Sequence, residues 1–396
     1  MIFNKQGSLI KKHKFFYKNI LIENTREYKY LGFTFSCSGS DNIGINNLLL
    51  QAKKAWYAIQ QFISKSKDKH FLTYMHLFDT QVKPIMLYAC ETWTESLKYE
   101  KNIINMLQKN NLEKFHLSVL KRLLGVNKKT TNISLLLETG RHPVTLSAHI
   151  QAIKYFLRFP STKVQSLLNI YYEKERRSQY SDPFIKYIID KLNKIGMPNV
   201  WREQLIQQHD FSKDTKLIAH IKTRLKDISS QEIVSALEEN QGKLIFLKQA
   251  KQNHNFESYL HINNFENRRA ITKLRTSSHK LEIETGRWNK IPRDQRVCKK
   301  CILNKIEDEN HLLFECQMYG TERKEFYDTI KSKIKVDLSH SPNHETRIQE
   351  IIYSENLGAL NALGKFIKNA LQKRENTICH ILPSKYIFYQ RVVNTL

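Results

Sequence analysis

Residues 298–316 constrain the fold of this chain more than any other stretch. They contain Cys298, Cys301, His311 and Cys316, with the spacing C-x2-C-x9-H-x4-C. A tight turn brings the sulfurs of the first two cysteines together, and His311 and Cys316 follow about one helical turn apart. Three thiolates and one imidazole complete a tetrahedron around Zn²⁺ and leave no open position. We therefore expect a structural zinc ion in residues 298–316, which we call the Cys-His segment.

Two other interpretations of this segment stay open. The four residues could be neighbours by chance, or Cys298 and Cys301 could form a redox dithiol. Redox motifs of that kind begin a helix after a strand and need neither the histidine nor the third cysteine. The remaining cysteines are isolated in sequence and are expected to be ordinary thiols: Cys37, Cys90 and Cys379.

The charge of the chain favours a polyanionic partner. Lysine and arginine number 64 against 38 acidic residues, which leaves a net charge of +26. Such an excess attracts nucleic acid or an anionic membrane face, although abundant lysine could also be incidental. The sequence has no signal peptide and no apolar stretch long enough to cross a membrane, so we expect an intracellular, reducing environment without a membrane partner.

The pattern along the chain predicts a mostly α protein with a small N-terminal β element. Few glycines and prolines, 12 and 8, disfavour a turn-rich β fold. Residues 1–36 alternate like strands, and later segments place apolar residues at helical spacing. The expected helical faces are Leu48–Ala52–Ala55–Ile59–Phe62, Phe71–Tyr74–Phe78–Val82 before Pro84, Phe115–Val119–Leu123 in a long helix from about Tyr99 to Leu124, Leu146–Ile150–Ile153–Leu157, and Leu360–Leu363–Ile367–Leu371.

A basic stretch precedes and enters the Cys-His segment. Lysines and arginines surround Trp288 there, a combination that suits phosphate contacts and base stacking, or else a solvated face with a packed tryptophan. The candidate nucleic-acid contacts in it are Arg275, Arg287, Trp288, Arg293, Arg296, Lys299 and Lys300. The sign of charge reverses at Glu307, Asp308 and Glu309, so we expect one basic and one acidic edge.

The motifs, taken in order, resemble the C-terminal part of reverse transcriptases from non-LTR (LINE-type) retrotransposons. "YKYLGFTFSCSGS" is similar to the strand and turn after the polymerase palm. Four stretches resemble, in order, the thumb-like region: "AKKAWYAIQQFISK", "LFDTQVKPIMLYACETW", "FHLSVLKRLLGVNKKTTNISLLLETGRHPV" and "IKYFLRF". "LRTSSHKLEIETGRWNKIPRDQRVCKKC" and "EDENHLLFEC" resemble the CCHC zinc knuckle. Gln317 stands where the family often has proline.

The resemblance covers about residues 1–160 and 262–320, as palm strands at 1–36, a thumb-like helical domain at 41–160 and a basic segment with the CCHC knuckle at 262–320. The helical pattern by itself predicts a helical linker domain at 161–261 and C-terminal helices at 321–396. The resemblance also implies that the basic thumb residues hold an RNA–DNA duplex: Lys121, Arg122, Lys128, Lys129 and Arg141. The resemblance therefore implies RNA and DNA as partners and a nuclear, rather than cytoplasmic, site of action.

One departure from the family concerns catalysis. The family's polymerase carboxylates form an aromatic-x-Asp-Asp strand, and this chain contains no Asp-Asp pair. Paired carboxylates are needed to hold two Mg²⁺ ions at the primer end. We therefore expect no Mg²⁺ site, a chain that starts just after that strand, and weakly protected strands in residues 1–36.

Three functions remain in competition. The first is a nucleic-acid-binding remnant that is not catalytic alone. The second is a piece of an active reverse transcriptase, which works with a separate polymerase catalytic segment. The third is a helical interaction module with structural zinc and incidental charge. Motifs of other enzyme classes are missing from the sequence. Five histidines that lie within helical patterns or at their ends are expected to be structural: His70, His76, His116, His142 and His149. Trp56, Tyr57 and Trp93 are expected to pack in the core and not to stack on bases.

Overall fold

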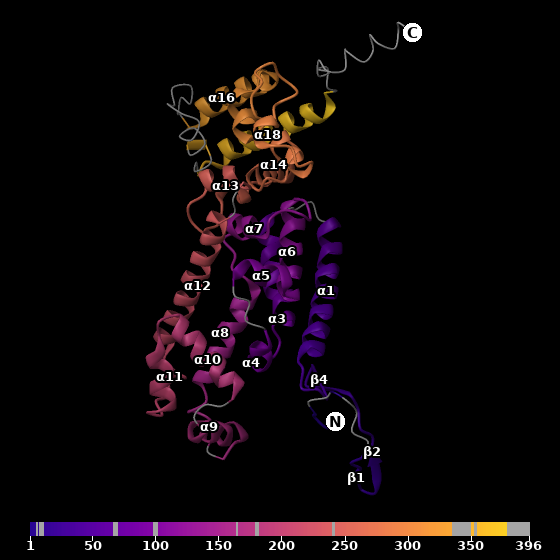
Figure 1. Cartoon of the computed structure of the whole chain (residues 1–396), viewed down its shortest axis with the longest axis vertical. Helices are drawn as coiled ribbons and strands as arrows, with labels where there is room; N and C mark the ends of the chain where they lie inside the picture. The colour runs from indigo at the N-terminus through magenta and orange to yellow at the C-terminus, as the bar shows by residue number, and fades with distance from the viewer. Residues whose placement is uncertain are drawn as a thin grey trace. The chain divides into compact units, whose positions relative to one another are not determined.

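The computed structural model describes residues 1–377 except 5–6, 8–11, 66–69, 98–101, 164, 179–181, 240–241, 335–349 and 352–354. Cys379 lies outside the described residues. The described part is mostly helical, with a small β element near the N-terminus, which confirms the predicted class (Figure 1). Its contacts define two compact units. Unit 1 comprises Met1–Lys67, Thr73–Ser118 and Arg141–Ala236, and unit 2 comprises Asp68–Leu72, Val119–Gly140 and Leu237–Leu396.

The strands expected in residues 1–36 are present as two antiparallel hairpins. β1 (Phe15–Tyr17) pairs with β2 (Ile20–Ile22), and β3 (Glu27–Tyr30) pairs with β4 (Phe33–Ser36). β4 packs against α1, and its Phe33 and Ser36 are buried, whereas every residue of β1 and β2 is exposed. The first hairpin therefore has little apolar burial to stabilise it.

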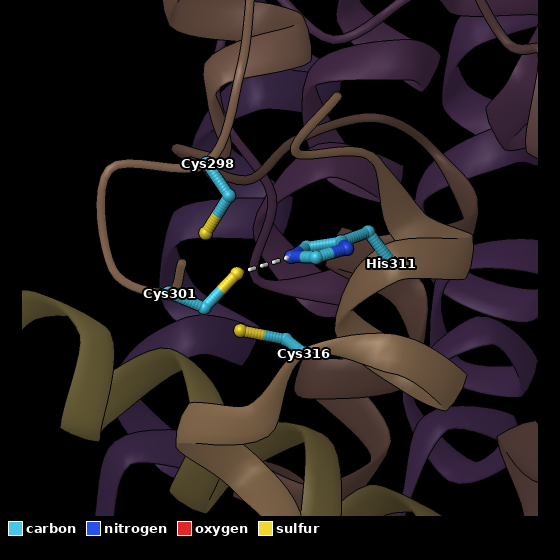
Figure 2. Close-up of side chains that lie close together, drawn as sticks. All are labelled: Cys298, Cys301, His311 and Cys316. Atoms are coloured by element: carbon cyan, nitrogen blue, oxygen red, sulfur yellow. Dashed lines mark hydrogen bonds between the residues drawn. The ribbon is translucent and has the colours of Figure 1, made fainter. Parts of the chain in front are cut away.

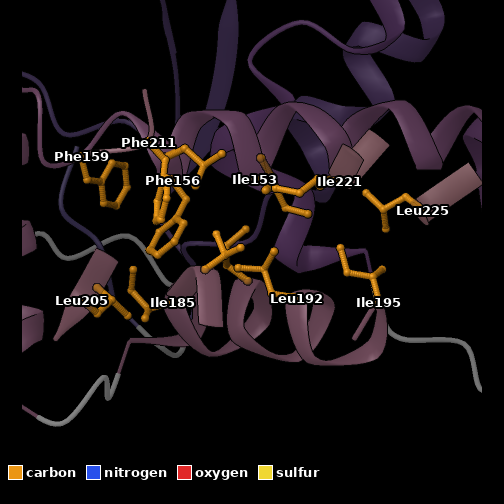
Figure 3. Close-up of a cluster of buried hydrophobic side chains, with 14 of the residues drawn as sticks. Ile153, Phe156, Phe159, Ile185, Leu192, Ile195, Leu205, Phe211, Ile221 and Leu225 are labelled. Carbon is orange, nitrogen blue, oxygen red and sulfur yellow. The ribbon is translucent and has the colours of Figure 1, made fainter. Parts of the chain in front are cut away.

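Unit 1 contains the helices α1 (Asn42–Lys65), α3 (Lys83–Met86), α4 (Cys90–Trp93), α5 (Ile103–Lys109), α8 (Val144–Leu157), α9 (Leu167–Arg177), α10 (Pro183–Lys194) and α11 (Pro198–Leu205), with the short turns η1 (Phe78–Val82) and η2 (Thr94–Ser96). Part of α2 (Phe71–Leu77), α6 (Asn111–Leu124) and α12 (Thr215–Glu238) also belongs to it. Phe156 of α8, Leu192 of α10 and Ile221 of α12 meet in its main apolar cluster (Figure 3).

Unit 2 contains α7 (Asn132–Thr139), α13 (Ile245–Ala250), α14 (Phe265–Arg275), α15 (Glu282–Trp288), α16 (Gly320–Ile334) and α18 (Leu357–Asn376), with the short turns η3 (Ser258–His261), η4 (Arg293–Gln295), η5 (His311–Glu315) and η6 (Gln317–Tyr319). α18 packs against α14 and α16, and the rings of Phe326 and Phe366 stack 5.3 Å apart. The predicted face of α18 is buried at Leu360, Leu363 and Ile367.

Two predicted helices are divided in the structure. Asn110 takes an extended conformation between α5 and α6, and its Oδ1 accepts hydrogen bonds from the backbone N–H groups of Leu112 and Glu113. This cap starts a new helix where a continuous one was expected. The second divided helix is the one predicted before Pro84. Its α-helical part, α2, ends at Leu77, and the π-helical turn η1 follows. Pro84 itself lies in the first turn of α3, where its missing N–H costs nothing.

The apolar face of α1 is narrower than its spacing predicts. Leu48, Ala52 and Trp56 are buried, whereas Phe62 is 82% exposed. Tyr57 is also exposed, at 57%, so the expectation that it packs in the core is wrong. It follows Trp56 directly, and adjacent helical residues point in directions about 100° apart. Trp93 is fully buried, as expected.

Candidate metal centre and basic surface

Cys298, Cys301, His311 and Cys316 converge at one point in unit 2 (Figure 2). All four are buried, and one ligand atom from each lies within 4.8 Å of the others. The Sγ atom of Cys301 and the Nε2 atom of His311 are 3.4 Å apart. Three sulfurs and one nitrogen at these separations form a group that can hold a metal ion.

A short hairpin presents the first two cysteines. Val297 and Ile306 form an antiparallel bridge, and the N–H of Cys298 donates to the carbonyl of Lys305 at 2.8 Å. The N–H of Lys300 points back to the Sγ atom of Cys298 at 3.4 Å. An N–H directed at a sulfur stabilises a thiolate, so the backbone of this turn favours the metal-binding form of Cys298.

The turn η5 presents the histidine and the last cysteine. Its start is fixed because Asp308 accepts a hydrogen bond from the N–H of His311 at 2.9 Å. The imidazole ring is also held through its second nitrogen, since Nδ1 lies 3.3 Å from a carboxylate oxygen of Glu315. This contact favours the tautomer with its proton on Nδ1, which leaves the Nε2 lone pair directed at the sulfurs.

A second layer of side chains holds the backbone of the segment. Arg323 donates to the carbonyl oxygens of Leu312, Leu313 and Cys316 at distances of 2.8–3.1 Å. On the other side, Arg374 of α18 forms two hydrogen bonds with Glu307, at 2.7 and 2.6 Å. These supporting residues were not found from the sequence. Glu315 was detectable, because it lies four residues after His311 at helical spacing, but the two arginines lie too far along the chain.

The ligand residues influence one another's protonation. A hydrogen bond with Cys316 and burial raise the pKa of Cys298 to about 12, and the same hydrogen bond lowers the pKa of Cys316. Burial also raises the pKa of Cys301. Burial opposes protonation of His311, but hydrogen bonds with Cys298 and Glu315 prevail and raise its pKa. A metal ion bound by the three cysteines and the histidine would replace the protons that these residues share in hydrogen bonds.

Of the predicted nucleic-acid contacts, six are exposed in unit 2: Arg122, Lys128, Lys129, Trp288, Arg293 and Lys299. Trp288 is 53% exposed, so it is not the packed tryptophan of the alternative interpretation. Lys299 forms an ion pair with Glu282 at 3.4 Å and remains more than half exposed.

Two of the predicted nucleic-acid contacts pair with acidic side chains of the protein itself. Arg275 is fully buried and pairs with Glu138 through two hydrogen bonds of 2.7 and 2.9 Å, so its assignment to a nucleic-acid surface is wrong. Arg141 belongs to unit 1, is 19% exposed and pairs with Asp79 at 2.5 Å. The Arg275 assignment rested on local sequence and the Arg141 assignment on the family resemblance, and neither reveals a distant carboxylate partner.

The other four predicted contacts are partly buried and engaged with neighbouring groups. Arg296 donates to the carbonyls of Ile283 and Ile291, and Arg287 pairs with Glu284 at 2.5 Å. Lys300 donates to the carbonyl of Thr377, and Lys121 donates to that of Lys128 at 2.8 Å. These four side chains bind neighbouring groups of the protein, so they are less available to phosphates than the exposed cations are.

Two basic stretches that are far apart in sequence are joined through residues 277–279. Ser278 accepts from the backbone N–H of Asn127 at 3.0 Å, next to Lys128 and Lys129. Its neighbours Ser277 and His279 contact Glu309 of the Cys-His segment at 3.3 and 2.9 Å. The expected acidic edge is wrong, because Glu307 and Glu309 are buried in internal pairs.

Comparisons with protein-family models, curated proteins and solved structures gave no match for this chain. None of the helices in the described part is both long enough and apolar enough to cross a membrane.

Proposed function

We propose that the four-residue cluster binds one structural Zn²⁺ ion. A buried set of three cysteines and one histidine supports this choice, because thiolate and imidazole ligands in a closed four-coordinate arrangement suit zinc. Purified chain is expected to contain one equivalent of zinc, and Co²⁺ exchange should give the absorption bands of tetrahedral thiolate coordination. Cys301→Ser should release the metal, and Cys37→Ser should retain it. Full metal occupancy in Cys301→Ser would refute the ligand assignment.

We further propose that unit 2 binds RNA and DNA without catalysis of its own. The observation that carries this proposal is the link through Ser278 and Glu309, which ties the loop bearing Lys128 and Lys129 to the Cys-His segment. The exposed Trp288 adds a surface on which a base can stack. In this proposal zinc keeps the Cys-His segment folded, and the exposed cations contact phosphates.

The sequence resemblance extends this proposal to the origin of the chain, its ligand and its site of action. The chain is proposed to be a remnant of a non-LTR retrotransposon reverse transcriptase, with an RNA–DNA duplex as ligand and a nuclear site of action. The absence of an Asp-Asp pair from the sequence supports a binding role instead of polymerisation.

Fluorescence anisotropy tests the binding proposal. The full chain is titrated with an RNA–DNA hybrid and with single-stranded RNA at two salt concentrations, with and without a zinc chelator. If the five exposed cations each neutralise one phosphate, log affinity should fall against log salt with a slope of about −4 to −5 for the hybrid. Chelation should remove part of the affinity. Weak, salt-insensitive binding that the chelator leaves unchanged would instead favour a helical interaction module.

Matched variants locate the interface. Lys299→Ala and Lys128→Ala should each weaken binding and reduce the salt slope by about 1. Trp288→Ala should cost about 1–3 kcal/mol with single-stranded RNA, because a stacked base is lost. Lys324→Ala, an exposed position on α16, is the control and should bind like the wild type. Equal losses at Lys299 and Lys324 would show that binding follows total charge alone.

A second proposal is that the chain is one piece of an active reverse transcriptase. The first hairpin favours it, because Phe16 and Ile20 are 62% and 71% exposed and its strands lack a further partner among the described residues. Such edges suit pairing with additional strands. Sequencing of the transcript tests this: an in-frame aromatic-x-Asp-Asp segment upstream of Met1 supports the second proposal, and a stop codon in that frame excludes a continuous polymerase.

A further inference from the structure

Unit 1 contains a cleft of about 580 Å³ that plays no part in the function proposed above. Residues of α1, α5, α6, α8, α10 and α12 line it. Its apolar wall is continuous with the core of the unit, since Ile195 and Leu225 belong to both (Figure 3). The volume lies in the range of about 300–1,000 Å³ that is usual for small-molecule sites. The cleft therefore has room for a small organic molecule.

Lys191 lines this cleft from α10, one helical turn before Ile195 of the apolar wall. Its side chain is partly buried, and its ammonium lies 5.6 Å from the centre of the Tyr187 ring. The Tyr187 hydroxyl bonds to Nδ1 of His149, which lines the cleft as well. An amine among aromatic and aliphatic groups loses part of the hydration that stabilises its charged form.

The neighbouring charges act on the same amine. Burial and, next, the nearby Lys194 lower the pKa of Lys191 to about 8, although Glu232 and Asp190 act in the opposite direction. At pH 7 roughly one tenth of such an amine is neutral, against less than about 0.1% for a lysine with an ordinary pKa. The neutral amine is the nucleophile, and burial beside a second cation is a known way to activate a lysine.

An aldehyde is the electrophile that suits an activated amine without any further reactant. The nitrogen attacks the carbonyl carbon, the two amine protons leave with the carbonyl oxygen as water, and a carbon–nitrogen double bond remains. This step needs neither an oxidant nor a reductant. We propose that the cleft binds a small apolar aldehyde and that Lys191 holds it as an imine, with the carbon skeleton of the aldehyde against the wall that contains Ile195 and Leu225.

Reductive trapping of the zinc-loaded full chain tests this proposal. The chain is incubated at pH 7 with benzaldehyde and sodium cyanoborohydride, and peptide mass spectrometry quantifies the benzyl group on each lysine. Lys191 should be labelled at least tenfold faster than Lys186, an exposed lysine of the same helix. Its labelling rate should also saturate at millimolar benzaldehyde. Equal rates at the two lysines would overturn the proposal, and so would a rate at Lys191 that never saturates, because no aldehyde would then be bound.

The pH dependence of trace acetylation with acetic anhydride tests the amine without the aldehyde. Acetylation of Lys191 should rise with a midpoint near pH 8. Lys194→Met should move this midpoint upward, because it removes a cation and leaves Glu232 without the partner that it contacts at 2.7 Å. A midpoint in the wild type near the ordinary lysine value of about 10.4 would overturn the proposal.

A variant that fills the cleft places the aldehyde. Asn46 lines the cleft from an exposed position on α1, so Asn46→Trp should slow benzaldehyde labelling of Lys191 at least tenfold. Leu50→Trp, which adds a tryptophan at an exposed position one turn away, is the control and should stay within twofold of the wild type. Unchanged labelling in a folded Asn46→Trp, or an equal loss in both variants, would overturn the assignment to this cleft.

A competitor keeps the test decisive if Asn46→Trp misfolds, which circular dichroism melting would reveal. Benzyl alcohol has the ring of benzaldehyde but no carbonyl group, so it can occupy the cleft without forming an imine. It should slow labelling of Lys191 and leave that of Lys186 unchanged, and equal rates with and without it would overturn the proposal. The result is independent of the RNA and DNA proposal, because the cleft belongs to unit 1 and the basic surface belongs to unit 2.

Discussion

At the scale of single residues, the two ring nitrogens of His311 have separate roles. Nε2 faces the cysteine sulfurs, and Nδ1 contacts Glu315. Glu315→Ala should therefore lower zinc affinity by about 10- to 100-fold without removing a ligand. Competition with a chromophoric chelator measures this. Glu325→Ala, which removes an exposed carboxylate from α16, is the control, and a similar loss in both variants would contradict a specific role for Glu315.

Arg275 illustrates a residue whose role depends on distant partners. It is fully buried between Glu138 and Glu257, at 2.7 and 3.0 Å. Arg275→Met should leave the buried Glu138 without its paired cation, and Glu257 with Lys251 alone, and should reduce the free energy of unfolding by about 3–5 kcal/mol. Urea unfolding monitored by circular dichroism checks this. An unchanged unfolding midpoint would contradict the pairing and reopen the surface role predicted from the sequence.

The contrast between these residues shows what the sequence can predict about the candidate site. The zinc ligands were predictable because four coordinating residues lie within nineteen positions and their spacing carries the geometry. The partner of Arg275 lies 137 positions away, so nothing local distinguishes this arginine from the exposed Arg293. For the same reason the cleft in unit 1 that Lys191 lines was not found, since its lining comes from six separate helices, α1, α5, α6, α8, α10 and α12.

The buried His149 predicts how stability depends on pH. Burial first, then Lys191 and Lys194, lower its pKa far below 6.5, so the folded chain binds fewer protons than the unfolded chain just below pH 6.5. This contribution to stability is present above pH 6.5 and is lost as the pH falls, by at most about 1.4 kcal/mol per pH unit. Urea titrations between pH 7 and 5.5 should show this loss. His149→Gln should reduce the slope, and an unchanged slope would contradict a neutral His149.

At the scale of secondary-structure elements, Gly140 is the residue that ends α7. Its φ angle is +58°, and an added Cβ would lie 2.6 Å from the backbone nitrogen of Phe256. Gly140→Ala should therefore destabilise the chain by about 1–2 kcal/mol for the left-handed conformation alone, and further through the contact. Gly242→Ala is the control, because its φ is +78° but nothing lies within 4 Å. Equal losses in urea unfolding would show that the Phe256 contact adds nothing.

Element boundaries were less predictable than element types. Apolar spacing identified the helices around Leu48, Ile153 and Leu363, because each buries one continuous face. The break at Asn110 was missed, since an asparagine cap depends on the backbone conformation that exposes its two N–H partners. The π-helical turn η1 was also missed, because its buried ends Phe78 and Val82 are four residues apart, a spacing that an α-helical face gives as well.

At the scale of the whole molecule, the metal ligands and their supporting residues all belong to unit 2. In the segment around them Leu312 and Leu313 are buried but Ile302 and Leu303 are exposed, so we expect metal binding to supply part of its folding free energy. Removal of the metal should therefore raise hydrogen exchange in unit 2, first around residues 297–316. The helices of unit 1 that bury Phe156 and Leu192 should keep their protection.

Hydrogen exchange with mass spectrometry, before and after chelation, measures this difference directly. The first hairpin provides an internal reference, because β1 and β2 are exposed and should exchange rapidly in both states. Cys301→Ser should reproduce the pattern of the chelated wild type, and zinc should fail to reverse it. Equal loss of protection in both units would show that the metal stabilises the whole chain. Unchanged protection at residues 297–316 would show that the segment folds without metal, and zinc would then have no structural role.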